Sequence, residues 1–110
     1  MPERSSLTSQ GNPRTIFRRG LERGNLLVAE ATAREVGVID LCEALELTAL
    51  IAERDRPRSE RYTVRWLARY LGAANAPTID EVALIAACLA ALGGRRHAAA
   101  LSVLRTVAGR

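Results

Sequence analysis

The chain has 110 residues and a formal net charge of +4, and all sixteen of its basic residues are arginine. This length favours one domain with a hydrophobic core and excludes a large multidomain enzyme. The longest apolar run, residues 82–92, is far shorter than the roughly 20 residues of a membrane-spanning helix. No secretory signal is evident at the start of the chain, so we expect a cytoplasmic protein.

The first part of the chain is expected to be a tail followed by helices. Residues 1–13 contain serines, two prolines and no hydrophobic periodicity, which predicts a disordered tail before a single helical domain over residues 14–110. Residues 14–36 show helical spacing that Gly24 and Asn25 interrupt. Two helices, with Asn25 as the N-cap of the second, are favoured over one long helix, because glycine is unfavourable inside a helix.

Asp40 has the position of an N-cap for a helix over residues 41–54. Apolar residues cover more than half of this helix, which predicts a core helix with a narrow acidic edge. Pro57 then opens a helix over residues 58–71, because proline is tolerated in the first turn.

The helix over residues 58–71 carries two rows of side chains at spacing i, i+4, i+8. One row is basic and the other is aromatic: Arg61, Arg65 and Arg69, and beside them Tyr62, Trp66 and Tyr70. One interpretation is that the aromatic side chains belong to the core and solvated arginines surround them. The others are a protein interface, which often uses Trp, Tyr and Arg, or a surface for single-stranded nucleic acid.

Residues 78–94 have the strongest helical signal in the chain. Thr78 and Glu81 have the spacing of a capping box, eleven apolar residues follow, and Gly93 and Gly94 end the helix. A helix that is apolar on every side is expected to be buried. The sequence therefore predicts a central core helix over residues 83–92, in which Ala87→Asp would prevent folding.

A last helix is expected from Arg95 to about Val107, with buried residues Ala98, Leu101 and Leu104 and either Val103 or Val107. Its start is also a candidate anion site, because glycine amides, a helix N-terminus and arginines can bind phosphate together. This candidate site consists of Gly93, Gly94, Arg95 and Arg96. A simple turn that ends the preceding helix explains the same residues and is favoured.

Catalytic chemistry is not expected. His97 is the only histidine, so no Ser-His-Asp set and no histidine-rich metal site can be assembled. A solvated or capping role is expected for it. Cys42 and Cys88 lie in apolar stretches without metal-ligand spacing and are predicted to be buried free thiols. We expect a non-enzyme that binds no metal and no cofactor.

The fold class predicted is all-α, with five or six helices in a compact bundle or a short α-solenoid of helix-turn-helix pairs. Residues 89–93, followed by Ala98 and Leu101, resemble the turn between the helices of a tetratricopeptide repeat. Residues 17–37 and 43–52 are similar to small, uncharacterised helical proteins encoded in actinobacterial genomes. The resemblance implies an all-α bacterial protein and no particular activity.

Charge alternates along the chain, since residues 30–53 are acidic and residues 54–69 are basic. Neutralisation within the fold, or across a dimer, is favoured over a basic surface for a polyanion. We therefore expect a non-catalytic protein–protein interaction module that uses the arginine and aromatic rows, with a protein partner that could be a second copy of the chain. The alternative is a protein that binds single-stranded RNA or DNA through the same basic side.

Overall fold

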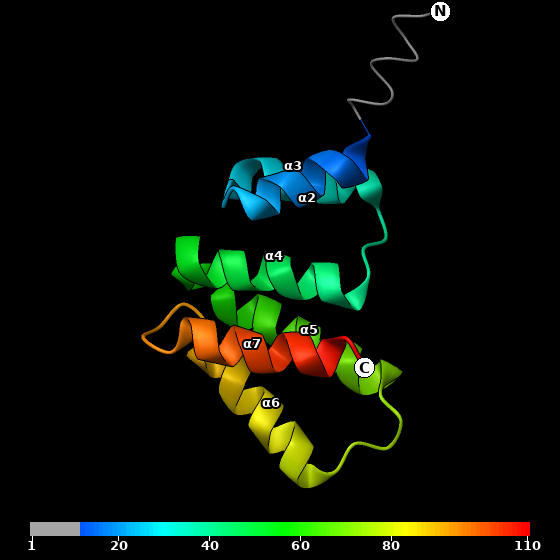
Figure 1. Cartoon of the computed structure of the whole chain (residues 1–110), viewed down its shortest axis with the longest axis vertical. Coiled ribbons are helices and arrows are strands. Elements are labelled where there is room, and N and C mark those ends of the chain that lie inside the picture. The colour runs from blue at the N-terminus through cyan, green and yellow to red at the C-terminus, as the bar shows by residue number, and fades with distance from the viewer. Residues whose placement is uncertain (1–11) are drawn as a thin grey trace, which may run out of the picture. The chain divides into compact units, whose positions relative to one another are not determined.

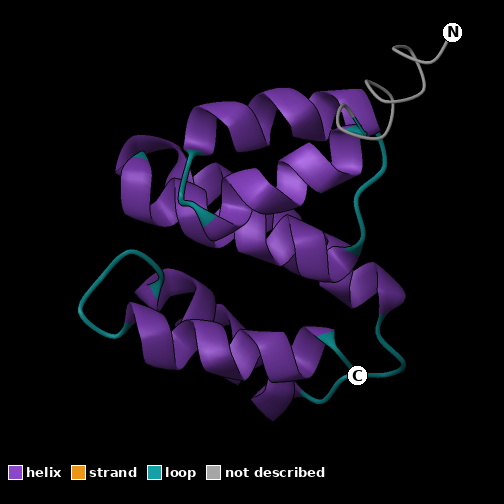
Figure 2. Cartoon of the chain, turned by 45° about the horizontal axis from the view of Figure 1, so that its top comes forward, coloured by secondary structure: helices purple, strands orange, loops and turns teal. Residues whose placement is uncertain are grey.

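The computed structural model describes residues 12–110, and within them every regular element is a helix (Figures 1 and 2). The predicted all-α class is therefore confirmed. The chain divides into two compact units. The first ends at Ile39, and the second is Asp40–Arg110. The sequence predicts a single domain over this range, and each unit is described separately below.

The first unit is a pair of helices, α2 (Pro13–Glu22) and α3 (Leu26–Val36). The prediction of two helices is confirmed, because Asn25 caps α3 by accepting a hydrogen bond from the Val28 amide at 3.2 Å. Asn12 caps α2 in the same way. The sequence predicts a disordered tail over residues 1–13, but residues 12 and 13 are the N-cap and the first residue of α2. The rest of that predicted tail, residues 1–11, lies outside the described range.

The second unit is a bundle of four α-helices. They are α4 (Leu41–Arg54), α5 (Ser59–Ala73), α6 (Ile79–Ala91) and α7 (His97–Ala108), with a short 3₁₀ turn, η1 (Arg56–Arg58), before α5. The two helices α4 and α6 each pack against α5 and α7 (Figure 1). This arrangement leaves one side of α6 without a helix of the same unit against it.

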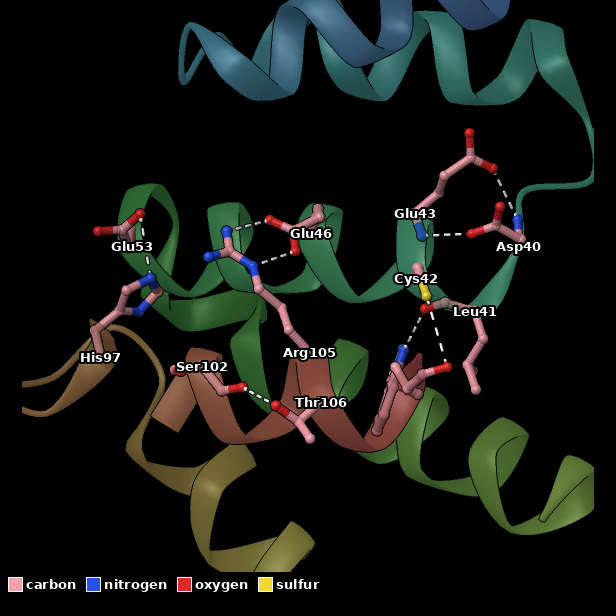
Figure 3. A network of polar contacts seen from close by, with 12 residues as sticks. Asp40, Leu41, Cys42, Glu43, Glu46, Glu53, His97, Ser102, Arg105 and Thr106 are labelled. Carbon is pink, nitrogen blue, oxygen red and sulfur yellow. Dashed lines mark hydrogen bonds and ion pairs between the residues drawn. The ribbon is translucent and has the colours of Figure 1, made fainter. Parts of the chain in front are cut away.

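Local capping residues set the helix starts in this unit. Asp40 and Glu43 form a complete capping box, in which each side chain accepts a hydrogen bond from the other residue's amide, at 2.7 and 2.9 Å (Figure 3). Only half of the predicted box at Thr78 forms. The Thr78 hydroxyl accepts from the Glu81 amide at 3.1 Å, while the Glu81 carboxylate lies 3.5 Å from that hydroxyl.

All four α-helices of the second unit contribute side chains to its core. Its buried members are Leu45, Ala49, Ala52, Trp66, Tyr70, Ile85, Leu89, Leu92, Ala100, Leu101, Leu104 and Val107. At the edge of this core Arg105 on α7 donates two hydrogen bonds to Glu46 on α4, at 2.7 and 2.8 Å (Figure 3). These bonds raise the pKa of the Arg105 guanidinium above its ordinary value. The pair is one instance of the predicted neutralisation between acidic and basic helices.

The prediction that residues 83–92 form a central helix buried on every side is wrong. Helix α6 has two buried residues, Ile85 and Leu89, and most of its other residues are exposed. Ala83, Leu84 and Ala87 are exposed because they lie on the side of α6 opposite to Ile85 and Leu89. The expectation that Ala87→Asp would prevent folding is therefore withdrawn, since the new carboxylate would face solvent in the folded chain.

Two smaller predictions also need correction. In α7 the buried alanine is Ala100, and Ala98 is exposed, because position 100 and not 98 shares a side with Leu104. Cys42 was expected to be buried but is exposed, with its thiol 3.6 Å from the Ala108 carbonyl oxygen. Both cysteines are free thiols, as predicted. No helix among the described residues is long and apolar enough to cross a membrane.

Candidate interaction surfaces

The aromatic row predicted on α5 is divided between the core and the surface. Trp66 is 2 % exposed, and its ring stacks on Tyr70 with centroids 5.6 Å apart and an interplanar angle of 15°. The indole N–H of Trp66 donates to the carbonyl oxygen of Leu41 at 3.0 Å, which ties α5 to the start of α4. For Trp66 and Tyr70 the core interpretation therefore holds, and neither is available to a partner in this conformation.

Tyr62, at the N-terminal end of the same row, is only partly buried and lies among arginines. The guanidinium carbons of Arg58, Arg61 and Arg65 lie 5.8, 6.0 and 5.5 Å from the centre of its ring. At these distances each cation is attracted to the ring quadrupole. We call Arg58, Arg61, Tyr62 and Arg65 the basic face.

The basic face has an excess of positive charge. Arg58 donates to the Asp55 carboxylate at 2.5 Å. By contrast, no carboxylate among the described residues forms an ion pair with Arg61 or Arg65. Arg69, the last member of the predicted basic row, is exposed one turn beyond Arg65. The structure thus brings Arg61, Tyr62 and Arg65 together, and it places Trp66 and Tyr70 in the core.

On another side of α5, a groove of about 430 Å³ separates this helix from α6. Its lining includes the apolar side chains of Val64, Leu67, Ala86 and Ala90. Arg56 and Glu60 stand among the polar residues that line it. The sequence analysis did not identify this groove, since it depends on how α5 and α6 diverge in space.

The candidate anion site does not present free glycine amides. The Gly93 amide donates to Nδ1 of His97 at 2.7 Å, and the Gly94 amide donates to the Ala91 carbonyl oxygen at 3.1 Å. Gly93 has a φ of +79°, which belongs to a helix-terminating turn. The geometry therefore agrees with the simple turn, although Arg95 and Arg96 are both exposed beside it.

His97 has a structural contact on each ring nitrogen. Nδ1 accepts from the Gly93 amide, so Nε2 carries the proton of the neutral ring and lies 3.5 Å from Glu53 (Figure 3). The expected solvated or capping role is therefore wrong: the ring holds the turn between α6 and α7, and no side chain caps the start of α7. No group of three or more His, Cys, Asp or Glu residues that could hold a metal ion occurs in the described range.

Replacing His97 tests this role. His97→Ala removes the acceptor for the Gly93 amide and should lower the free energy of unfolding by about 1 kcal/mol. His97→Asn should lower it less, because an Asn side chain can place an oxygen near the position of Nδ1. Urea unfolding followed by circular dichroism measures both values. Equal losses for the two variants would contradict the assigned hydrogen bond.

Comparisons with known proteins supply no further assignment. A scan of protein-family models finds no match, and searches of curated proteins and of solved structures find no similar chain.

Proposed function

We propose that the protein is a non-catalytic helical module that binds an acidic protein partner through the basic face. The observation that supports this proposal is the clustering of three guanidinium groups around the partly buried Tyr62 ring. Arginine and tyrosine are the residues most often found as anchors of protein interfaces. Two of these arginines lack a carboxylate partner among the described residues, and a carboxylate on another protein would supply one.

Single-stranded nucleic acid is the competing partner for the same surface. Proteins that bind single strands without sequence preference stack successive bases on several aromatic rings. Here Trp66 and Tyr70 are buried, so Tyr62 is the only ring of the row that could stack on a base. One ring supports a nucleic-acid function less well than the three rings of the sequence prediction did.

A binding assay with two probes tests the proposal. A fluorescent oligoglutamate peptide represents an acidic protein segment, and a mixed-sequence single-stranded oligonucleotide represents the alternative. The double variant Arg61→Glu/Arg65→Glu should weaken peptide binding at about 0.1 M salt by at least about tenfold, because like charges then face each other. Fluorescence anisotropy of the full chain measures both affinities.

The matched control is Arg23→Glu/Arg34→Glu, which makes the same change in net charge at two exposed arginines of the other unit. It should retain peptide binding within about twofold, since long-range charge effects are screened by salt. Equal losses in the two variants would show that net charge, not the basic face, governs binding. Preferential binding of the oligonucleotide, lost only in the first variant, would replace the protein partner with nucleic acid.

A further inference from the structure

One side of α6 is apolar, exposed and uncovered by the other helices of its unit. Ile79 is 85 % exposed and Leu84 is 53 % exposed, and Ala83, Ala87 and Ala90 are exposed on the same side. We call these five residues the α6 face. Figure 1 shows α6 at the edge of the four-helix unit, where α5 and α7 separate it from α4.

Large apolar side chains are also exposed on the two helices that pack against α6. They are Val64 (60 %) and Leu71 (39 %) on α5 and Val103 (36 %) on α7. Exposed apolar residues concentrated on one part of a surface are typical of a protein interface.

The two ends of the α6 face carry opposite charges. Asp80 is exposed at the N-terminal end, and Arg95 and Arg96 are exposed in the turn that follows the C-terminal end. None of residues 82–92 between them is charged. No ion pair involves Asp80, Arg95 or Arg96 among the described residues. The α6 face is thus an apolar strip about 20 Å long with a negative end and a positive end.

Such a strip is complementary to a second copy of itself turned by 180°. In an antiparallel pair the Asp80 end of each α6 lies against the Arg95 and Arg96 end of the other copy. The favourable charge contact therefore occurs at both ends of the interface. Ala87 lies midway along the chain between Asp80 and Gly94, so it falls near the two-fold axis. Alanine at the crossing point lets two helices approach closely, and a two-fold contact uses the same surface on both copies.

We propose that two copies of this chain form a dimer through the α6 face, with the two α6 helices antiparallel. A parallel pair would bring the two Asp80 side chains together and the arginines together, which like-charge repulsion disfavours. This dimer is independent of the basic face, because Arg61 and Arg65 are not part of the α6 face. The variant Arg61→Glu/Arg65→Glu should therefore still dimerise.

Sedimentation velocity of the full chain gives the first test. The wild type should reach twice the chain mass of 11.9 kDa as concentration rises. Concentrations up to about 0.5 mM are needed, since a small interface of this kind is expected to be weak. Ala87→Asp should remain a monomer with an unchanged helical circular dichroism spectrum. The control Ala31→Asp, at an exposed alanine of α3, should dimerise as the wild type does.

Charge exchange gives a second test, which does not depend on the fold tolerating Ala87→Asp. Asp80→Arg alone, and Arg95→Asp/Arg96→Asp alone, should each weaken self-association by at least about tenfold. An equimolar mixture of these two variants should restore the dimer, because each chain then presents the charge that the other lacks. A monomeric wild type over the whole concentration range, or a mixture that stays monomeric, would overturn the proposal.

Discussion

Gly93→Ala should lower the free energy of unfolding of the four-helix unit by at least about 3 kcal/mol. Gly93 has a φ of +79°, a conformation in which a side chain is strained. A Cβ atom added there would also lie 2.3 Å from the carbonyl oxygen of Ala52. Ala52 is fully buried in α4, so its backbone cannot move away without disturbing the core. Thermal unfolding followed by circular dichroism measures the loss.

Gly72→Ala is the matched control in the same unit. Gly72 lies within α5, and a Cβ atom there would meet no heavy atom within 4 Å. Alanine in an exposed helical position should raise the free energy of unfolding by about 0.5–1 kcal/mol. Replacing glycine by alanine should thus lower the free energy of unfolding at Gly93 and raise it at Gly72. A Gly93→Ala variant as stable as the wild type would mean that the turn between α6 and α7 does not lie against α4 as described.

Trp66→Ala should lower the free energy of unfolding by about 3–5 kcal/mol, because it opens a cavity where a large buried ring had been. The substitution also removes the stack on Tyr70 and the indole hydrogen bond to Leu41. Trp66→Phe keeps part of the ring volume and should cost less. Circular dichroism is the suitable probe, since Trp66 is the only tryptophan and its fluorescence disappears in both variants.

Tyr62→Ala makes a similar truncation one turn earlier in the same row of α5. Tyr62 is only partly buried and contacts arginine side chains at the surface. Removing the Tyr62 ring should therefore lower the free energy of unfolding by about 1 kcal/mol or less. In the peptide-binding assay, the same variant should weaken binding while Trp66→Phe leaves it nearly unchanged. Equal stability losses for Tyr62→Ala and Trp66→Ala would contradict the division of the row into surface and core.

Several helix boundaries could be predicted because capping chemistry is local, whereas α5 runs two residues past its predicted end and α7 begins at His97, two residues after its predicted start. Asn25 and Asp40 each satisfy amides within the first turn of the helix that follows, so their effect does not depend on the rest of the fold. Gly37 and Gly93 likewise end helices through their own backbone conformations. For the same reason α2 and α3 were separated correctly, and the all-α class followed from the helical periodicity.

The arrangement on α5 could be predicted only in part. The spacing of Tyr62, Trp66 and Tyr70 shows that they share one side of a helix, which the structure confirms. How far each ring is buried depends on which helices pack against each turn of α5, and the spacing alone does not give this. Trp66 in the middle of α5 and Tyr70 towards its C-terminal end belong to the core, and Tyr62 near its N-terminal end does not.

The place of α6 was decided by tertiary structure. An apolar composition on every side predicts burial, but α6 buries Ile85 and Leu89 on one side and exposes Ile79, Leu84 and several alanines on the other. An exposed alanine leaves little apolar area in water and is also the best helix former, so an alanine-rich side does not require burial. The sequence by itself thus determined the helices, their composition and those helix starts that a side-chain cap fixes. Only the packing of α5 and α7 decided that α6 lies at the edge of its unit, with one apolar side uncovered.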